Sequence, residues 1–263
     1  MELTSQASSG ALQIQVFGAS VIGPMHSQRN LPCQDACAYG VATGNAVVIV
    51  MADGLGSATK SEIGASIAVD SAFRHCLNTI AVTPVEDLRL EDVVRDAAAY
   101  ARQELERLAQ QRSYRLGDLA CTLIVVVVLK GRLALAHIGD GAVVAQGEGG
   151  LRLVSGPEES EYINEVVPLT SSEWQASLRI AITDGVTDGL GVFTDGLHRA
   201  AFRRIEGALV PFDGFFGPIF NYARQVVENL QGSNEISALL SSPKLSEHSD
   251  DDKTLVVAVL RHE

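Results

Sequence analysis

Four apolar runs along the chain each meet an acidic turn. Residues 46–52, 133–138 and 178–183 each lead into an aspartate within two residues, and residues 254–260 follow three aspartates at 250–252. Each run has the length of a strand and is rich in β-branched residues, which predicts buried β-strands. Further strands are predicted at 12–17, 119–129, 143–146 and 151–154.

Apolar residues recur at helical spacing at 61–78 and 91–112, and the second segment has charged residues on its opposite face. Residues 196–240 also favour helix, with a break rich in Gly, Pro and Phe at 211–218. Strands, two helices, more strands, helices and a final strand follow one another in that order. This order predicts an α+β fold, a sheet sandwich flanked by helices. We expect one domain over 1–263, with a structured core at about 12–260.

Four phenylalanines gather near the predicted helix break, at positions 212, 215, 216 and 220. They favour a packed hydrophobic cluster, and a flap or a partner surface is the alternative.

Composition narrows the possible functions. The chain has 263 residues, 46% of them hydrophobic, and a net charge of -12 with a pI of about 4.9. This acidic balance argues against a nucleic-acid partner, which needs a basic face. We expect a cytoplasmic protein with no membrane partner, because no signal peptide is evident and the longest apolar run, 121–129, is too short to span a bilayer. The four cysteines are then reduced thiols.

The acidic turns suggest a metal site. Asp53, Asp140 and Asp184 follow strands and Asp251 precedes one, so all four would meet at one edge if the last strand ran antiparallel to the others. Two carboxylates about 4 Å apart repel by roughly 4 kcal/mol at an effective dielectric of 20, so such a cluster needs cations. Oxygen ligands favour Mg²⁺ or Mn²⁺. The alternative is that each Asp-Gly pair is only a turn.

These residues resemble the metal-dependent type 2C serine/threonine protein phosphatases, in particular a bacterial-like subset, in order over about 13–260. The similar motifs are Gln34-Asp35-Ala36, Ala52-Asp53-Gly54-Leu55-Gly56-Ser57, Ala120-Cys121-Thr122, Ile138-Gly139-Asp140-Gly141, Thr183-Asp184-Gly185-Val186-Thr187-Asp188 and Asp251-Asp252-Lys253-Thr254. The resemblance implies an αββα sandwich of two mainly antiparallel sheets, with two Mg²⁺ or Mn²⁺ ions in a cleft and a looser third site.

The resemblance also implies roles for individual residues. Asp53 would bridge two metals, with the Gly54 carbonyl on one of them, and Asp184 and Asp251 would hold the other. These three aspartates are the predicted catalytic residues. Asp140 and Asp188 fit the third metal site.

The early acidic motif departs from the family pattern. Gln34 stands where many members have Glu, and we predict Gln34 and Asp35 as metal ligands. Arg29 is displaced by one residue from the usual phosphate-binding arginine, and His26 resembles a histidine of the bacterial-like subset. Arg29 and His26 are the predicted phosphate contacts.

The predicted function is hydrolysis of phosphoserine or phosphothreonine by metal-activated water. The partner would be a phosphorylated protein, a Ser/Thr kinase or its target, in a signalling role. Two alternatives remain: a catalytically weak phosphoprotein-binding module on the same fold, and a two-metal phosphatase for small phosphoesters.

Overall fold

The computed structural model describes residues 12–157, 166–186 and 188–262. Two five-stranded sheets face each other, and every pairing within them is antiparallel. The first sheet has the order β1 (Leu12–Val21), β12 (Lys253–His262), β9 (Gly189–Phe193), β6 (Ala142–Gly147) and β7 (Gly150–Ser155). The second has the order β2 (Ala36–Ala42), β3 (Ala46–Ala52), β4 (Leu123–Leu129), β5 (Arg132–Ile138) and β8 (Arg179–Thr183).

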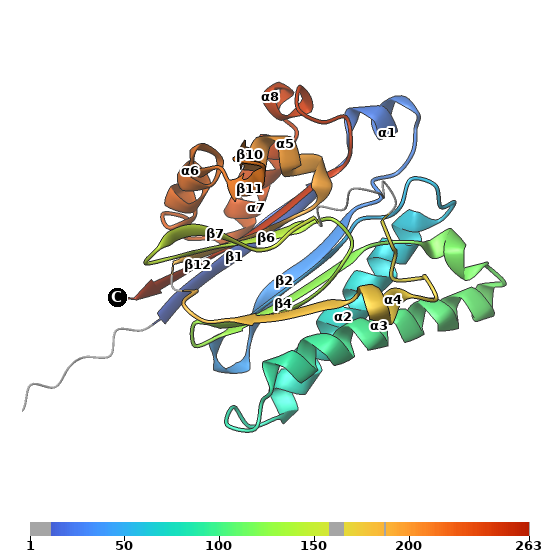
Figure 1. Cartoon of the computed structure of the whole chain (residues 1–263), viewed down its shortest axis with the longest axis horizontal. Helices are drawn as coiled ribbons and strands as arrows, with labels where there is room; N and C mark the ends of the chain where they lie inside the picture. The colour runs from blue at the N-terminus through green and yellow to red at the C-terminus, as the bar shows by residue number, and fades with distance from the viewer. Residues whose placement is uncertain (1–11, 158–165, 187, 263) are drawn as a thin grey trace, which may run out of the picture.

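Helices cover the outer face of each sheet (Figure 1). The second sheet is covered by α2 (Ser61–Val82) and α3 (Leu90–Arg112), and the first by α5 (His198–Ala201), α6 (Asp213–Ala223) and α7 (Asn229–Leu240). The shorter elements are α1 (Pro24–Gln28), α4 (Trp174–Ser177), α8 (Pro243–Ser246), the hairpin β10 (Phe202–Ile205) and β11 (Ala208–Pro211), and the 3-10 turns η1 (Thr43–Asn45), η2 (Leu116–Leu119) and η3 (Asp195–Leu197). The predicted αββα sandwich is confirmed.

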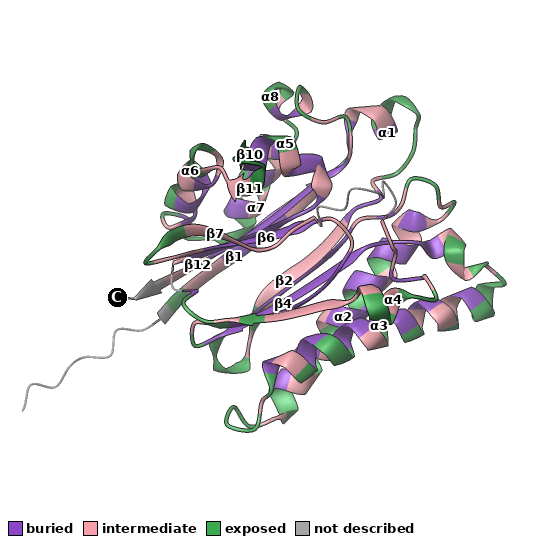
Figure 2. Cartoon of the chain, in the orientation of Figure 1, coloured by how far each residue is buried: buried purple, intermediate pink, exposed green. Residues whose placement is uncertain are grey.

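Burial on both faces explains why the strands read as continuous apolar runs (Figure 2). In β4, Val125 and Val127 pack toward α2 and α3, whereas Ile124 and Val126 pack between the sheets. The side-chain period of two therefore divides one apolar run between two cores. The predicted strand at 119–129 begins later than expected, since residues 116–119 form a 3-10 turn.

The short strand β9 was not predicted, and its glycines are the reason. Gly189 and Gly191 interrupt the apolar pattern, which lowers strand propensity. A Cβ at Gly189 would lie 3.2 Å from the Phe220 ring, and one at Gly191 would lie 3.1 Å from the Phe216 ring. The glycines thus let two phenyl rings of α6 rest directly on the strand.

The same contact places two of the four phenylalanines of this segment in the core. Phe216 and Phe220 are fully buried and their rings stack with centroids 5.9 Å apart. The helix break predicted at 211–218 is wrong from Asp213 onward, because α6 starts there and continues through Pro218; Pro211 ends β11, so the hairpin and not a helix precedes it. Apolar packing of one helical face outweighs the poor helix propensity of its glycines and proline.

Candidate active site

Four aspartates meet at one edge of the sandwich. Asp53 follows β3, Asp140 lies two residues after β5, Asp195 lies two residues after β9, and Asp251 lies two residues before β12. Together they line one cleft, whose other described lining residues are Met25, His26, Gln34, Gly54, Leu55, Gly56, Thr122 and Val166. Carboxylate oxygens of Asp53, Asp140 and Asp195 lie within 4.8 Å of one another.

The backbone of Asp53 is hydrogen-bonded to the residue that precedes β4. Its N–H donates to Thr122 Oγ1 at 2.8 Å, and its carbonyl accepts the Thr122 N–H at 2.8 Å. Gly54 follows where a side chain cannot fit, because a Cβ there would lie 2.7 Å from the Ser61 Cβ. The start of α2 therefore packs against the turn and fixes both the Asp53 carboxylate and the Gly54 peptide at the cleft.

The electrostatics of the cluster favour cations. Burial raises the pKa of Asp53 well above its usual range, and the charges of Asp35, Asp195, Asp140 and Asp251 raise it further. Burial, followed by the charges of Asp140 and Asp251, raises the pKa of Asp195 to about 6. Without positive charge these groups disfavour one another's ionised forms.

The donor set fits hard divalent ions. Among the described residues, Asp195 Oδ1 and Gln34 Oε1 are buried oxygens without a hydrogen-bond partner. Gln34 is 7% exposed, and its side chain contributes to the cleft wall. Unpaired buried oxygens beside clustered carboxylates match the all-oxygen coordination of Mg²⁺ and Mn²⁺. A direct bond from Gln34 to a metal stays a prediction.

Asp35 lies behind the cleft wall. Its Oδ2 accepts hydroxyl hydrogen bonds from Thr194 at 2.8 Å and from Thr254 at 2.7 Å. Burial is the largest cause that raises the pKa of Asp35, to about 8. Since Thr194 precedes Asp195 and Thr254 belongs to β12, Asp35 ties together the segments that carry two cleft aspartates. Its predicted role as a metal ligand stays a prediction.

Asp251 reaches the cleft from a densely bonded turn before β12. Its backbone carbonyl accepts from the ammonium of Lys253 at 2.9 Å, and Lys253 is 1% exposed. Its own carboxylate accepts the Asp252 N–H at 2.8 Å. The predicted position of Asp251 at the strand edge is confirmed, and its role on the metals stays a prediction.

The prediction that Asp184 belongs to this site is wrong. Strand β8 runs antiparallel to β5, so Thr183 pairs with Leu133 at the start of β5, whereas Asp140 follows its end. Strand β5 has seven residues, so its two ends are six steps apart, about 20 Å at ~3.3 Å per residue. The Asp184 side chain is 80% exposed and lies 3.9 Å from Arg132.

Asp188 is also at the far edge, so its predicted place in a third metal site is wrong. It immediately precedes β9, its N–H donates to Gln146 O at 3.3 Å, and Asp195 lies beyond the other end of that strand. Asp195 takes the place that the prediction gave to Asp184. The signal was present, since Thr-Asp-Gly occurs three times, at 183–185, 187–189 and 194–196.

The two predicted phosphate contacts have different positions. His26 is 5% exposed and lines the cleft, whereas Arg29 follows α1 at the surface and is not among the described lining residues. A phosphate role for His26 stays a prediction, and the structure gives no support for Arg29. Sequence reasoning did not single out Asp252, which contacts His26 from inside the fold at 2.9 Å.

Comparison with known proteins shows one family. Residues 22–241 match the model described as Protein phosphatase 2C. The chain is 32% identical over 248 residues to serine/threonine-protein phosphatase 3 of Escherichia coli K12, covering 92% of this chain and 96% of that protein.

Solved structures share the fold at lower identity. The serine/threonine phosphatase PstP/Ppp of Mycobacterium tuberculosis is 18% identical with a TM-score of 0.64, covering 95% of this chain and 99% of that one. The catalytic domain of PstP in complex with two manganese ions is 17% identical with a TM-score of 0.64 and the same coverage. No helix in the described part of the chain has the length and apolar character needed to cross a membrane.

Proposed function

Because this chain belongs to the protein phosphatase 2C family, we propose that it hydrolyses phosphoserine and phosphothreonine in proteins through metals held by Asp53, Asp195 and Asp251. The observation that carries the site is the convergence of Asp53, Asp140 and Asp195, whose oxygens lie within 4.8 Å at the edge of two sheets. The family is metal-dependent, and this donor set fits Mg²⁺ or Mn²⁺.

The cleft residues have different proposed roles in metal binding. Asp53 is central in the cluster, so it is the candidate for the ligand shared by two ions, with the Gly54 carbonyl beside it. Asp195 and Asp251 complete one ion site, and Asp140 is available for a third. Bound divalent ions supply an activated water and positive charge that neutralises the phosphoryl oxygens. The rigid strand ends hold the carboxylates in place for this chemistry.

The substrate, the cellular role and the domain organisation are part of the same proposal. The substrate is a phosphorylated protein, and we infer that it is a Ser/Thr kinase or a kinase target in cytoplasmic signalling. The unit is one domain over 1–263, which the pairing of β1 with β12 supports, because strands near both ends of the chain lie side by side. A catalytically weak binding module is supported only by Gln34 at the cleft wall, where an amide replaces a charged ligand.

The decisive experiment compares Asp195→Asn with Asp184→Asn on a phosphothreonine peptide in millimolar Mn²⁺. We expect Asp195→Asn to abolish turnover and Asp184→Asn to keep it, because only Asp195 lies at the cleft. A sugar phosphate as a second substrate tests the small-phosphoester alternative. Equal losses in the two variants, or faster turnover of the sugar phosphate, would refute the proposal.

A further inference from the structure

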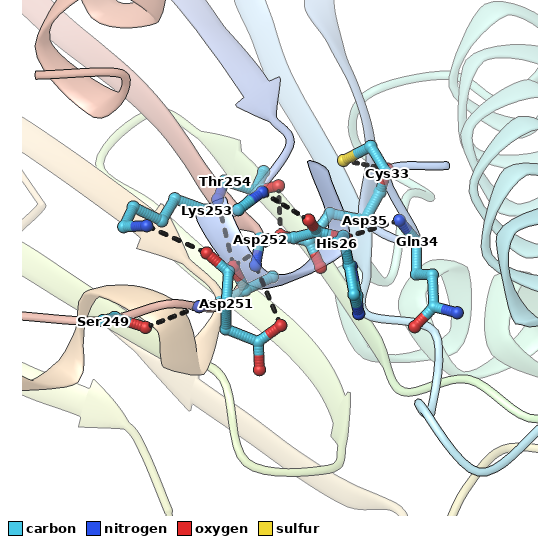
Figure 3. A network of polar contacts seen from close by, with 11 residues as sticks. His26, Cys33, Gln34, Asp35, Ser249, Asp251, Asp252, Lys253 and Thr254 are labelled. Carbon is cyan, nitrogen blue, oxygen red and sulfur yellow. Dashed lines mark hydrogen bonds and ion pairs between the residues drawn. The ribbon is translucent and has the colours of Figure 1, made fainter. Parts of the chain in front are cut away.

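Asp252 is a buried residue whose carboxylate accepts three hydrogen bonds next to the cleft (Figure 3). Its Oδ1 accepts the Gly23 N–H at 2.7 Å, and its Oδ2 accepts the Gln34 N–H at 2.6 Å and contacts His26 Nδ1 at 2.9 Å. Asp252 is 3% exposed. It therefore fastens both ends of the loop from Gly23 to Gln34 to the turn before β12.

This arrangement fixes the orientation of the His26 ring. Because the Asp252 carboxylate already accepts two backbone N–H groups, it acts as an acceptor for His26, and the ring proton lies on Nδ1. Nε2 then carries the lone pair in the neutral ring. In Figure 3 this second ring nitrogen, the Asp251 carboxylate and the Gln34 amide all extend to the same side of the turn.

The part of the cleft wall formed by His26, Gln34 and Asp251 has groups that suit a cation. One ring nitrogen of His26 and one carboxylate oxygen each of Asp251 and Asp252 lie within 4.8 Å of one another. Asp252 is already occupied by its three contacts and His26 Nδ1 by Asp252, which leaves Nε2 of His26 and the Asp251 carboxylate, groups of two residues that line the same cleft. Gln34, whose Oε1 is buried and has no hydrogen-bond partner, is a lining residue of the same cleft. No lysine or arginine occurs among the described lining residues, so an anion alone would find no permanent positive charge there.

We propose that His26 Nε2 is a nitrogen ligand to an ion held at Asp251, with Asp252 as the residue that positions the imidazole. A metal-bound histidine typically donates its other ring N–H to a carboxylate, and this chain has that pair in place. The proposal rests on the function proposed above and adds a basis for metal choice. Imidazole suits Mn²⁺ and later transition metals better than Mg²⁺, which prefers oxygen ligands. An ion site that includes His26 therefore favours Mn²⁺ over Mg²⁺.

Pulsed electron paramagnetic resonance of the Mn²⁺-loaded protein tests the bond directly. The unsubstituted protein should show coupling of Mn²⁺ to ¹⁴N, which changes to the ¹⁵N pattern when the protein carries ¹⁵N-histidine. This comparison needs no substitution, so it does not depend on the folding of a variant. His26→Gln should lose the coupling, and His248→Gln, at an exposed residue after α8, should keep it.

Titration calorimetry with Mn²⁺ and with Mg²⁺ tests selectivity. His26→Gln should reduce the ratio of Mn²⁺ to Mg²⁺ affinity, and Asp252→Asn should weaken Mn²⁺ by about 10–100-fold, the usual effect of losing a carboxylate behind a metal-bound histidine. Mn²⁺ bound without nitrogen coupling would overturn the inference even if the protein hydrolyses the phosphopeptide. Unchanged Mn²⁺ affinity in His26→Gln with weaker inhibition by inorganic phosphate would overturn it in favour of a phosphate contact. A protein that binds no Mn²⁺ and turns over no phosphopeptide would refute the proposed function itself.

Discussion

Replacing Asp195 with Asn should stabilise the metal-free protein while it removes the metal site. The pKa of Asp195 is raised from 3.8 to about 6, first by burial and then by the charges of Asp140 and Asp251. An acid with a raised pKa in the folded state costs stability once it must ionise there. A shift of this size corresponds to about 3 kcal/mol at pH values above 6. Asn is nearly isosteric and carries no charge, so it removes this cost.

The pH dependence follows from the same shift. Below pH 3.8 the carboxyl is protonated in both the folded and the unfolded chain, so it makes no difference to stability. Between pH 3.8 and about 6 the unfolded chain loses the proton first, and the penalty grows to its full value. The stability advantage of Asp195→Asn in chelator should therefore increase from pH 4 to pH 7.

Urea unfolding in EDTA, followed by far-UV circular dichroism at several pH values, measures this advantage. Asp184→Asn is the matched control, since the Asp184 side chain is 80% exposed and the change should stay within about 0.5 kcal/mol. In saturating Mn²⁺ the unsubstituted protein should become more stable than Asp195→Asn, because its free energy of unfolding gains a metal-binding contribution that the variant does not have. A less stable Asp195→Asn in EDTA at pH 7.5, or an effect independent of pH, would refute the electrostatic reasoning.

Four further outcomes are expected. Mn²⁺ or Mg²⁺, but not Na⁺ at equal ionic strength, should raise the melting temperature, because ion binding adds about 2.7 kcal/mol to the free energy of unfolding at one hundred times the dissociation constant. An unchanged melting curve would argue against the site. Asp53→Asn should abolish phosphopeptide turnover with an unchanged circular dichroism spectrum, and activity near that of the unsubstituted protein would remove Asp53 as the shared ligand. Gln34→Glu should lower the Mn²⁺ concentration for half-maximal activity, because a carboxylate adds charge at an oxygen site; superimposable titrations would exclude Gln34 from the site. Gly191→Val should cost about 1–3 kcal/mol in urea unfolding, since its side chain would press on the Phe216 ring 3.1 Å from the Cβ position, and no loss would contradict that packing.

The sequence alone determined the layers of the fold and three of the four cleft aspartates. Strand-length apolar runs can be buried only if both faces of a sheet are covered, so they predict strands between helical layers. Asp53, Asp140 and Asp251 each lie within two residues of such a run, and a residue at a strand end is placed by that strand. Local pattern was enough for these elements because each strand is apolar throughout.

Which Thr-Asp-Gly belongs to the site depends on how the strands are arranged in the folded chain. The tripeptide occurs three times between residues 183 and 196, and its local chemistry is the same each time. The direction of the preceding strand selects Asp195, because β8 runs antiparallel to β5 and carries Asp184 to the opposite edge. Strand β9, which precedes Asp195, could not be predicted from the sequence, because two glycines interrupt its apolar pattern. These glycines are needed only in the folded chain, where Phe216 and Phe220 pack on them. The contact of His26 with Asp252 spans 226 residues of sequence, and such a pairing is decided by the packing of the whole chain and not by any local pattern.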